Sequence, residues 1–179
     1  MPADCSQTMT LETGFGPCAL TWTARGLARV RLLDAAPPRS SAGPLPEQAT
    51  VCAALLERYF NGNAVDFDPV PLDFDGISAE MAAIYRALRG IRWGQATTYG
   101  ALAAAVGMPG AARVVGVAMA RNPWPVIVPC HRVLAAGGRL GGFSAPGGTR
   151  TKERLLALEG IDYPRETPLL PGLFLSDPS

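Results

Sequence analysis

Apolar and polar residues alternate along the first part of the chain with the two-residue period of β-strands. Three short segments share this pattern: Thr10–Thr13, Cys18–Trp22 and Leu27–Leu32. Glycine-containing turns separate them, and the proline-rich stretch 34–46 that follows is expected to be a loop. In Gln48–Phe60 the apolar residues recur every three or four positions, which predicts a helix. The pattern therefore indicates a small α/β domain with an antiparallel sheet.

Helical spacing dominates the second part of the chain. Ser78 is the predicted N-cap of a first helix, which ends at Gly90. Thr97 or Thr98 is a candidate cap for a second helix, Tyr99–Val106, and a four-residue glycine turn joins it to a third, Ala111–Arg121. Helix, short glycine turn and helix form the pattern of a helix-turn-helix unit, although most helix pairs with this pattern only pack against each other.

The two parts meet in a connector rich in aspartate and proline, Asp66–Asp75. A chain of 179 residues is long enough for one or two domains, and we expect two, 1–78 and 79–179. The predicted fold class is α/β (α+β). The first domain combines an antiparallel sheet with a helix, and the second is mostly helical and winged-helix-like around its helix-turn-helix.

The region after the third helix is rich in proline and then in glycine. Its prolines exclude a helix, and the apolar run Val126–Val128 predicts a short strand that leads to Cys130. The glycine-rich stretch 137–148 predicts loops. A last helix is expected at Arg150–Leu158, with its leucines on the buried side.

The composition is that of a folded globular protein, with 48% hydrophobic and 17% charged residues. No apolar run reaches 18 residues, so we expect no membrane span, and no basic residue precedes Arg25, which argues against a secretory signal peptide. The net charge of +1 argues against a nucleic-acid partner, but it averages two unlike parts. Residues 1–78 hold five basic and nine acidic residues, whereas residues 79–179 hold 11 basic and six acidic ones. The basic part, with its helix-turn-helix pattern, is suited to the phosphates of DNA.

Four cysteines are widely spaced along the chain: Cys5, Cys18, Cys52 and Cys130. This spacing favours free thiols in a reducing cytoplasm over a disulfide framework or a zinc site. Cys130 precedes the only histidine, His131. A thiol with a pKa near 8.5 needs a base or a positive charge to become a nucleophile at neutral pH, and His131 and Arg132 are candidates. Taken alone, the dipeptide also fits an inert buried thiol beside a core histidine.

A longer stretch around Cys130 resembles a known family. The pentapeptide Pro-Cys-His-Arg-Val at 129–133 follows Asn122-Pro123 and precedes Gly-Gly-Phe-Ser at 141–144. This arrangement is similar to the active-site signature of the 6-O-alkylguanine-DNA alkyltransferases. The likeness extends over about 70 residues, 91–160, whereas the first domain matches only in general architecture.

The resemblance implies direct-reversal DNA repair, in which Cys130 would accept the alkyl group of 6-O-alkylguanine, with 4-O-alkylthymine as a second candidate substrate. His131 would remove the thiol proton through a water, and Glu159 would orient His131. Asn122 would stabilise the turn before Cys130, and Tyr99 would place its hydroxyl on a ring nitrogen of the guanine. Because a thioether is chemically inert, each molecule would act once, as a suicide enzyme.

The resemblance also implies double-stranded DNA as the partner, bound in the minor groove with the target base flipped out of the duplex. Arg113 would occupy the space that the base leaves. Further DNA contacts are expected from Thr98, Tyr99, Ala112, Gly116 and Met119. The base would be held by Tyr99, Val133, Phe143 and Ser144. The resemblance implies no cofactor or metal, and we expect a monomer in a bacterial-type cytoplasm, associated with the nucleoid through DNA.

Two other function classes remain open. A lesion-sensing relative of these transferases would bind DNA without catalysis, but such proteins carry tryptophan at the position of Cys130. A cysteine hydrolase could use Cys130, His131 and Glu159, yet the sequence gives no independent sign of an oxyanion hole. One departure concerns the substrate: Phe143 stands where many family members have tyrosine, so a hydroxyl contact would be lost there.

Overall fold

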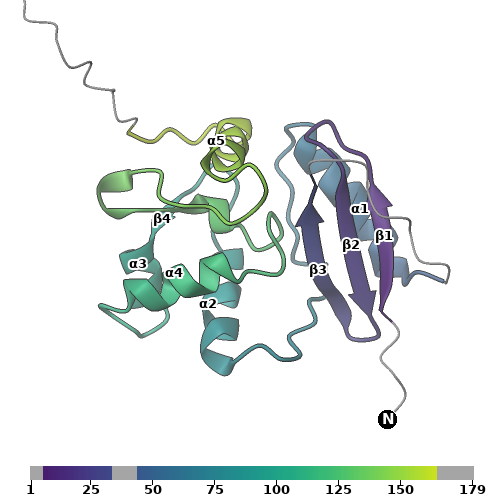
Figure 1. The fold of residues 1–179 in the computed structure, drawn as a ribbon, viewed down its shortest axis with the longest axis horizontal. Coiled ribbons are helices and arrows are strands. Elements are labelled where there is room, and N and C mark those ends of the chain that lie inside the picture. Colours follow the sequence, from purple (N-terminus) through teal and green to yellow (C-terminus); the bar gives the residue numbers. More distant parts are fainter. Residues whose placement is uncertain (1–5, 34–43, 165–179) are drawn as a thin grey trace, which may run out of the picture.

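The chain forms two lobes that lie side by side, one containing a β-sheet and the other mostly helical (Figure 1). This computed structural model describes residues 6–33 and 44–164. The sheet lobe contains β1 (Gln7–Leu11), β2 (Cys18–Thr23), β3 (Gly26–Leu32) and α1 (Glu47–Phe60). The helical lobe contains α2 (Ala79–Arg89), β4 (Thr97–Thr98), α3 (Tyr99–Ala105), α4 (Ala112–Ala120), the 3-10 turn η1 (Cys130–Arg132), β5 (Val133–Leu134), the 3-10 turn η2 (Ala136–Gly138) and α5 (Thr149–Leu158).

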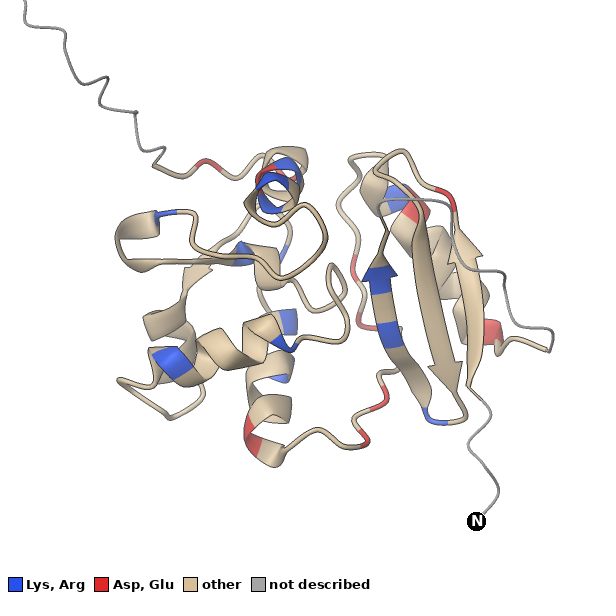
Figure 2. Cartoon of the chain, in the orientation of Figure 1, with Lys and Arg blue, Asp and Glu red and all other residues tan. Residues whose placement is uncertain are grey.

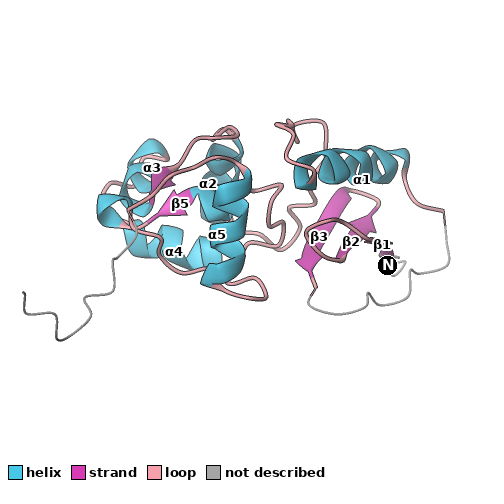
Figure 3. Ribbon diagram, turned by 90° about the horizontal axis from the view of Figure 1, so that it is seen from above, coloured by secondary structure: helices cyan, strands magenta, loops and turns pink. Residues whose placement is uncertain are grey.

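The sheet is antiparallel in the order β1-β2-β3, as the alternation of residues predicts. Helix α1 covers one of its faces (Figure 3). Inward-facing side chains such as Leu20 and Trp22 are buried against the apolar face of α1, where Cys52 and Leu56 are also buried. The remaining face of α1 is exposed, which explains its helical rather than continuous apolar pattern.

Strand β3 is the edge of the sheet that adjoins the helical lobe (Figure 1). Its backbone is bonded to segments outside the sheet: Val30 N–H donates to Pro123 O over 2.8 Å, and Leu27 O accepts the indole N–H of Trp124 over 2.6 Å. The connector approaches the start of β3 so closely that a Cβ at Gly26 would lie 2.6 Å from Pro71 O. These contacts satisfy an edge that would otherwise be open, and they join the two lobes.

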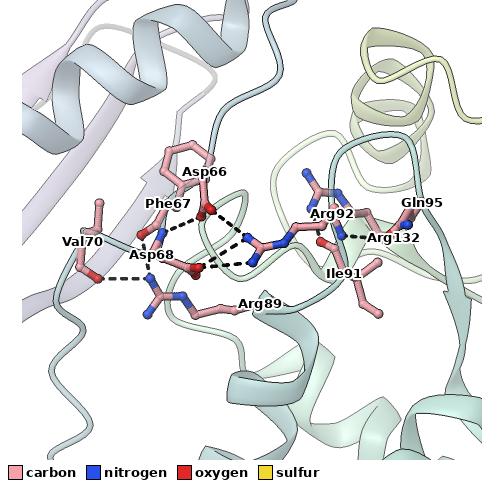
Figure 4. Close-up of polar contacts among 9 residues, drawn as sticks. All are labelled: Asp66, Phe67, Asp68, Val70, Arg89, Ile91, Arg92, Gln95 and Arg132. Atoms are coloured by element: carbon pink, nitrogen blue, oxygen red, sulfur yellow. Dashed lines mark hydrogen bonds and ion pairs between the residues drawn. The ribbon is translucent and has the colours of Figure 1, made fainter.

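The connector is also held by two arginines from the end of α2 (Figure 4). Arg89 donates to backbone carbonyls, and Arg92 forms ion pairs with carboxylates. Their acceptors are the carbonyl oxygens of Phe67 and Val70 and the side chains of Asp66 and Asp68. Two of the four connector aspartates thus bind the second lobe, whereas Asp73 and Asp75 form ion pairs with Arg25 of the first lobe.

The predicted helix boundaries agree with the structure to within one residue. Ser78 Oγ accepts the N–H of Met81 at the start of α2, and Thr98 Oγ1 accepts the N–H of Ala101 at the start of α3. Helices α3 and α4 are joined by a glycine-containing turn and pack together as the helix-turn-helix pattern predicts. The short strands β4 and β5 form a parallel pair beside them.

Two sequence predictions need correction. The first strand covers Gln7–Leu11 rather than Thr10–Thr13, because the hydroxyl of Thr13 closes a turn onto Gly16 O (2.6 Å). Val126–Val128 does not form a strand but a tight turn, and Cys130 therefore lies on η1 rather than on a strand. The predictions for Cys5, for most of the 34–46 loop and for the tail beyond 164 fall outside the described residues.

Candidate active site

The turn that precedes Cys130 is held by the side chain of Asn122. Its Nδ2 donates to Val128 O over 2.8 Å, and its Oδ1 accepts the N–H of Trp124 over 3.0 Å. Within this turn Val126 has φ +76°, a left-handed conformation that is unfavourable for a β-branched residue. The amide of Asn122 thus stabilises a strained turn that sets the position of Cys130.

Cys130 lies at the wall of a cavity of about 260 Å³ and is 5% exposed. The cavity is formed by α3, α4 and the loop after η2, and its lining residues are Tyr99, Gly116, Met119, Ala120, Cys130, Gly142, Phe143 and Ser144. Five of the predicted binding residues are therefore brought together around the thiol. A larger groove of about 580 Å³ reaches Cys130 from the side of β3.

The other predicted contact residues lie outside this cavity. Thr98 and Ala112 are half-buried at the starts of α3 and α4, and Arg113 is exposed on the first turn of α4. Val133 is fully buried, and its carbonyl accepts a hydrogen bond from Lys152 Nζ over 2.6 Å. The predicted residues thus divide into a cavity group and a group at the beginnings of the two helices.

His131 follows Cys130 in η1, and its ring is completely buried. Its Nε2 lies 2.7 Å from Glu159 Oε1, while its Nδ1 has no hydrogen-bond partner among the residues that the structure describes. A carboxylate can only accept hydrogen bonds, so the ring proton belongs on Nε2. This tautomer leaves Nδ1 with a free lone pair that can take up a proton.

Arg132, a candidate from the sequence, and Tyr59, which the sequence did not assign to the site, complete the surroundings of Glu159. Arg132 binds both carboxylate oxygens, through Nε to Oε2 (2.7 Å) and Nη2 to Oε1 (2.9 Å). Tyr59, on α1 of the first lobe, donates its hydroxyl hydrogen to Glu159 Oε1 over 2.5 Å and lies 3.2 Å from His131 Nε2. No local signal could have revealed Tyr59, since it precedes Glu159 by 100 residues.

The buried charges control the protonation of this network. Burial acts to raise the pKa of Glu159, but hydrogen bonds and positive charge from His131 and Arg132 outweigh it and lower that pKa to about 2. Burial lowers the pKa of His131, against the attraction of Glu159. At neutral pH the network therefore pairs an ionised carboxylate with a neutral imidazole.

The thiol of Cys130 is not ionised at rest. Burial raises its pKa, and the Asn122 side chain and the charge of Lys152 offset this only in part. Lys152 is itself completely buried, which lowers its pKa to about 8. A protonated thiol needs a base at the moment of reaction, and the neutral His131 beside it is chemically able to serve.

Other reactive groups are sparse in the part of the chain that the structure describes. Cys18 and Cys52 are buried free thiols, and burial raises the pKa of each to about 12. Within residues 6–33 and 44–164 no three His, Cys, Asp or Glu side chains group closely enough to hold a metal ion. None of the helices in these ranges is long and apolar enough to cross a membrane.

Two family models match successive parts of the chain. Residues 8–74 match the ribonuclease-like domain of 6-O-methylguanine DNA methyltransferase, and residues 80–161 match its DNA binding domain. The two matches cover the sheet lobe and the helical lobe, respectively, and the second includes Cys130, His131 and Glu159.

Individual proteins are similar over almost the whole chain. A methylated-DNA–protein-cysteine methyltransferase from Mycobacterium tuberculosis is 36% identical, covering 89% of this chain and 96% of its own. A human protein of the same name is 35% identical, covering 89% of this chain and 84% of its own. The crystal structure of Mycobacterium tuberculosis OGT in complex with DNA superposes with a TM-score of 0.70 and 37% identity, covering 86% of this chain and 92% of that one.

Proposed function

The chain belongs to the 6-O-methylguanine DNA methyltransferase family, and we propose that it repairs DNA by moving an alkyl group from O6 of guanine to Cys130. The observation that carries this assignment is the position of Cys130. Its thiol lies at the wall of a cavity, and the next residue in the chain, His131, forms a buried pair with Glu159 and can serve as a base. The relatives named above are methyltransferases that act on methylated DNA, and one of them has been crystallised with DNA.

The transfer is a single displacement at the alkyl carbon. As His131 Nδ1 takes the thiol proton through a water, the sulfur of Cys130 forms a bond to the carbon and the bond from that carbon to O6 breaks. The bonding electrons pass to the guanine ring, where the hydroxyl of Tyr99 donates a hydrogen bond to a ring nitrogen and offsets the negative charge. Burial raises the pKa of Tyr99, so its hydroxyl keeps the hydrogen that this role needs. The guanine anion takes up a proton from water as His131 releases the proton of the thiol. The products are therefore guanine and an S-alkylcysteine, which ends the activity of the molecule.

The helix-turn-helix carries the proposed DNA contacts. Small residues of α4, such as Ala112 and Gly116, let the helix approach the minor groove closely. O6 of guanine is inaccessible inside a duplex, so the nucleotide must rotate into the cavity. Arg113, which is exposed at the start of α4, would fill the vacated space. Basic residues are more frequent than acidic ones in the helical lobe, as this binding requires (Figure 2).

We assign the chain two domains, 1–78 and 79–179, because the connector between the lobes ends just before α2 and the two family models meet there. One thiol repairs one lesion, so a monomer suffices. A protein that repairs the chromosome of a bacterial-type cell works in the cytoplasm at the nucleoid.

Transfer of a labelled methyl group from duplex DNA containing 6-O-methylguanine tests the assignment. The protein should gain one equivalent of label and then stop, and Cys130→Ala should gain none. Cys52→Ala is the matched control, because Cys52 is an equally buried thiol in α1, away from the cavity. Label retained by Cys130→Ala, or continued turnover beyond one equivalent, would exclude Cys130 as the acceptor.

A further inference from the structure

We infer that Tyr59, contributed by the first domain, is a positioning residue of the alkyl transfer. Its hydroxyl fixes Glu159 and commits His131 to the tautomer in which Nδ1 is free to take the proton of Cys130. The expected effect of Tyr59 on the rate of alkyl transfer rests on the proposed function. The expected protonation state of the His131 ring does not depend on that function.

The hydroxyl of Tyr59 has one hydrogen and two neighbours that could receive it. Glu159 Oε1 lies 2.5 Å away and His131 Nε2 lies 3.2 Å away, so the hydrogen goes to the shorter contact and to the charged acceptor. The Tyr59 oxygen then faces Nε2 only as an acceptor. With acceptors from both Tyr59 and Glu159 around it, Nε2 must carry the ring proton.

The consequence appears on the opposite side of the imidazole. Nδ1 of His131 is completely buried and has no hydrogen-bond partner within residues 6–33 and 44–164, which is an uncommon and costly state for a ring nitrogen. A free acceptor in this position is what proton removal from the neighbouring thiol requires. In the alternative tautomer, an unprotonated Nε2 would face the carboxylate and a protonated Nδ1 would be left unsatisfied.

Tyr59 is rigidly placed for this task. Its ring makes edge-on contacts with Phe60 and Trp93, with ring centroids 5.2 Å apart in each pair, and the side chain is fully buried. Arg132, which binds the same carboxylate, also donates to the carbonyl of Ile91 (Figure 4). Glu159 is therefore held between an arginine of the second domain and a tyrosine of the first.

The hydroxyl also moderates the charge that His131 experiences. Ionisable groups face the imidazole from three elements: Tyr59 from α1, Cys130 and Arg132 from η1, and Lys152 and Glu159 from α5 and its end. Of these, only Glu159 favours the imidazolium. A hydrogen bond from Tyr59 weakens the hold of that carboxylate on a ring proton and so helps to keep His131 neutral. Loss of the hydroxyl should therefore make the imidazole more basic.

The test is Tyr59→Phe, which removes one oxygen and keeps the ring contacts. Because His131 is the only histidine of the chain, its NMR signals report its pKa and tautomer without ambiguity. We expect the pKa of His131 to rise by about one unit, a tenfold change in proton affinity. The single-turnover rate is measured with duplex DNA containing 6-O-methylguanine, at saturating protein. As the pH is lowered, this rate should begin to fall at a correspondingly higher pH in Tyr59→Phe than in the wild type, because His131 is protonated earlier.

Tyr85→Phe is the matched control. Tyr85 is also fully buried and donates one hydrogen bond, to Ala118 O over 2.8 Å, but it does not touch Glu159 or His131. It should lower stability and leave the midpoint of the acid limb in place. If Tyr59→Phe behaves in the same way, with an unshifted midpoint and an unchanged histidine signal, Tyr59 is only structural. If the wild-type protein transfers no alkyl group, the proposed function fails, and the histidine signal alone still decides the tautomer.

Discussion

Replacement of Glu159 by glutamine removes a buried negative charge and exchanges one of the two acceptor oxygens for an amide NH2 group, which cannot accept a hydrogen bond. The amide keeps the shape of the side chain, but it leaves the guanidinium of Arg132, which is 5% exposed, without an opposite charge. In the wild-type protein Arg132 makes two hydrogen bonds to this carboxylate, of 2.7 and 2.9 Å. The variant should fold, because the remaining contacts of η1 and α5 are unaffected, but with a smaller free energy of unfolding.

The decrease in the free energy of unfolding of Glu159→Gln can be calculated in two independent ways. The pKa of Glu159 is lowered from 4.5 to about 2, and at about 1.4 kcal/mol per unit this stabilises the folded protein by about 3 kcal/mol at neutral pH. Breaking a buried ion pair by removing one partner costs about 3–5 kcal/mol. We therefore expect Glu159→Gln to lower the free energy of unfolding at pH 7 by about 3 kcal/mol.

The pH dependence follows from the direction of the shift. The folded protein keeps Glu159 ionised down to about pH 2, while the unfolded chain takes up a proton near pH 4.5. The stabilisation is therefore complete above pH 5 and is lost as the pH falls from 4.5 towards 2. The difference between the two proteins should narrow over that range, because both then carry an uncharged side chain.

Urea unfolding monitored by the fluorescence of the buried Trp22 and Trp124 measures these quantities. Glu57→Gln, on the exposed face of α1, is the matched control and should change the free energy of unfolding by less than about 0.5 kcal/mol. If Glu159→Gln is within about 1 kcal/mol of the wild type at pH 7, or if the difference stays constant down to pH 3, the carboxylate does not contribute as argued.

Two further substitutions separate DNA handling from chemistry. Arg113→Ala should slow transfer from duplex DNA at least about tenfold, because nothing then occupies the space of the extruded base, and should leave transfer from the free 6-O-methylguanine base unchanged; equal losses on both substrates would contradict this role. Lys152→Met removes the hydrogen bond to Val133 O and a positive charge near Cys130, so transfer from both substrates should slow about tenfold. The pKa of Lys152 is about 8 in the folded protein and 10.5 in the unfolded chain. Between these two pH values the unfolded chain binds more protons, so the free energy of unfolding of the wild type should rise relative to that of Lys152→Met. Urea titrations at each pH measure this difference.

Local signals predicted much of the fold. The caps at Ser78 and Thr98 depend on bonds to backbone groups three residues away, so the sequence carries them directly. The turn at Val126–Val128 shows the opposite case. Its apolar run is typical of a strand, but a side-chain amide from Asn122 and the neighbouring prolines impose a turn instead. Alternation alone could not reveal a conformation that depends on one side chain.

The candidate site was predictable as far as its residues share one segment or resemble a known signature. Cys130, His131 and the loop around Phe143 fall within the signature. In the structure Cys130 and Phe143 line one cavity, and His131 is buried next to Cys130 in the chain. Tyr59 and Lys152 were not found, because a tyrosine on an apolar helix face and a lysine in an amphipathic helix both have ordinary explanations. Their roles arise only from packing between distant segments.

The first domain contributes to the proposed alkyl transfer at two separate points. On one side, Leu27 O of β3 accepts the indole N–H of Trp124 over 2.6 Å and so supports the strained turn before Cys130. On the other side, Tyr59 reaches Glu159 from α1 over 2.5 Å. The turn before the proposed nucleophile and the carboxylate beside its proposed base are thus each held by a hydrogen bond between the two lobes. A left-handed valine costs about 1–3 kcal/mol and persists only where its surroundings determine it. The helical domain alone would keep the hydrogen bonds of Asn122 but lose the one from the Trp124 indole to Leu27 O. We therefore expect the position of the Cys130 thiol to depend on both domains.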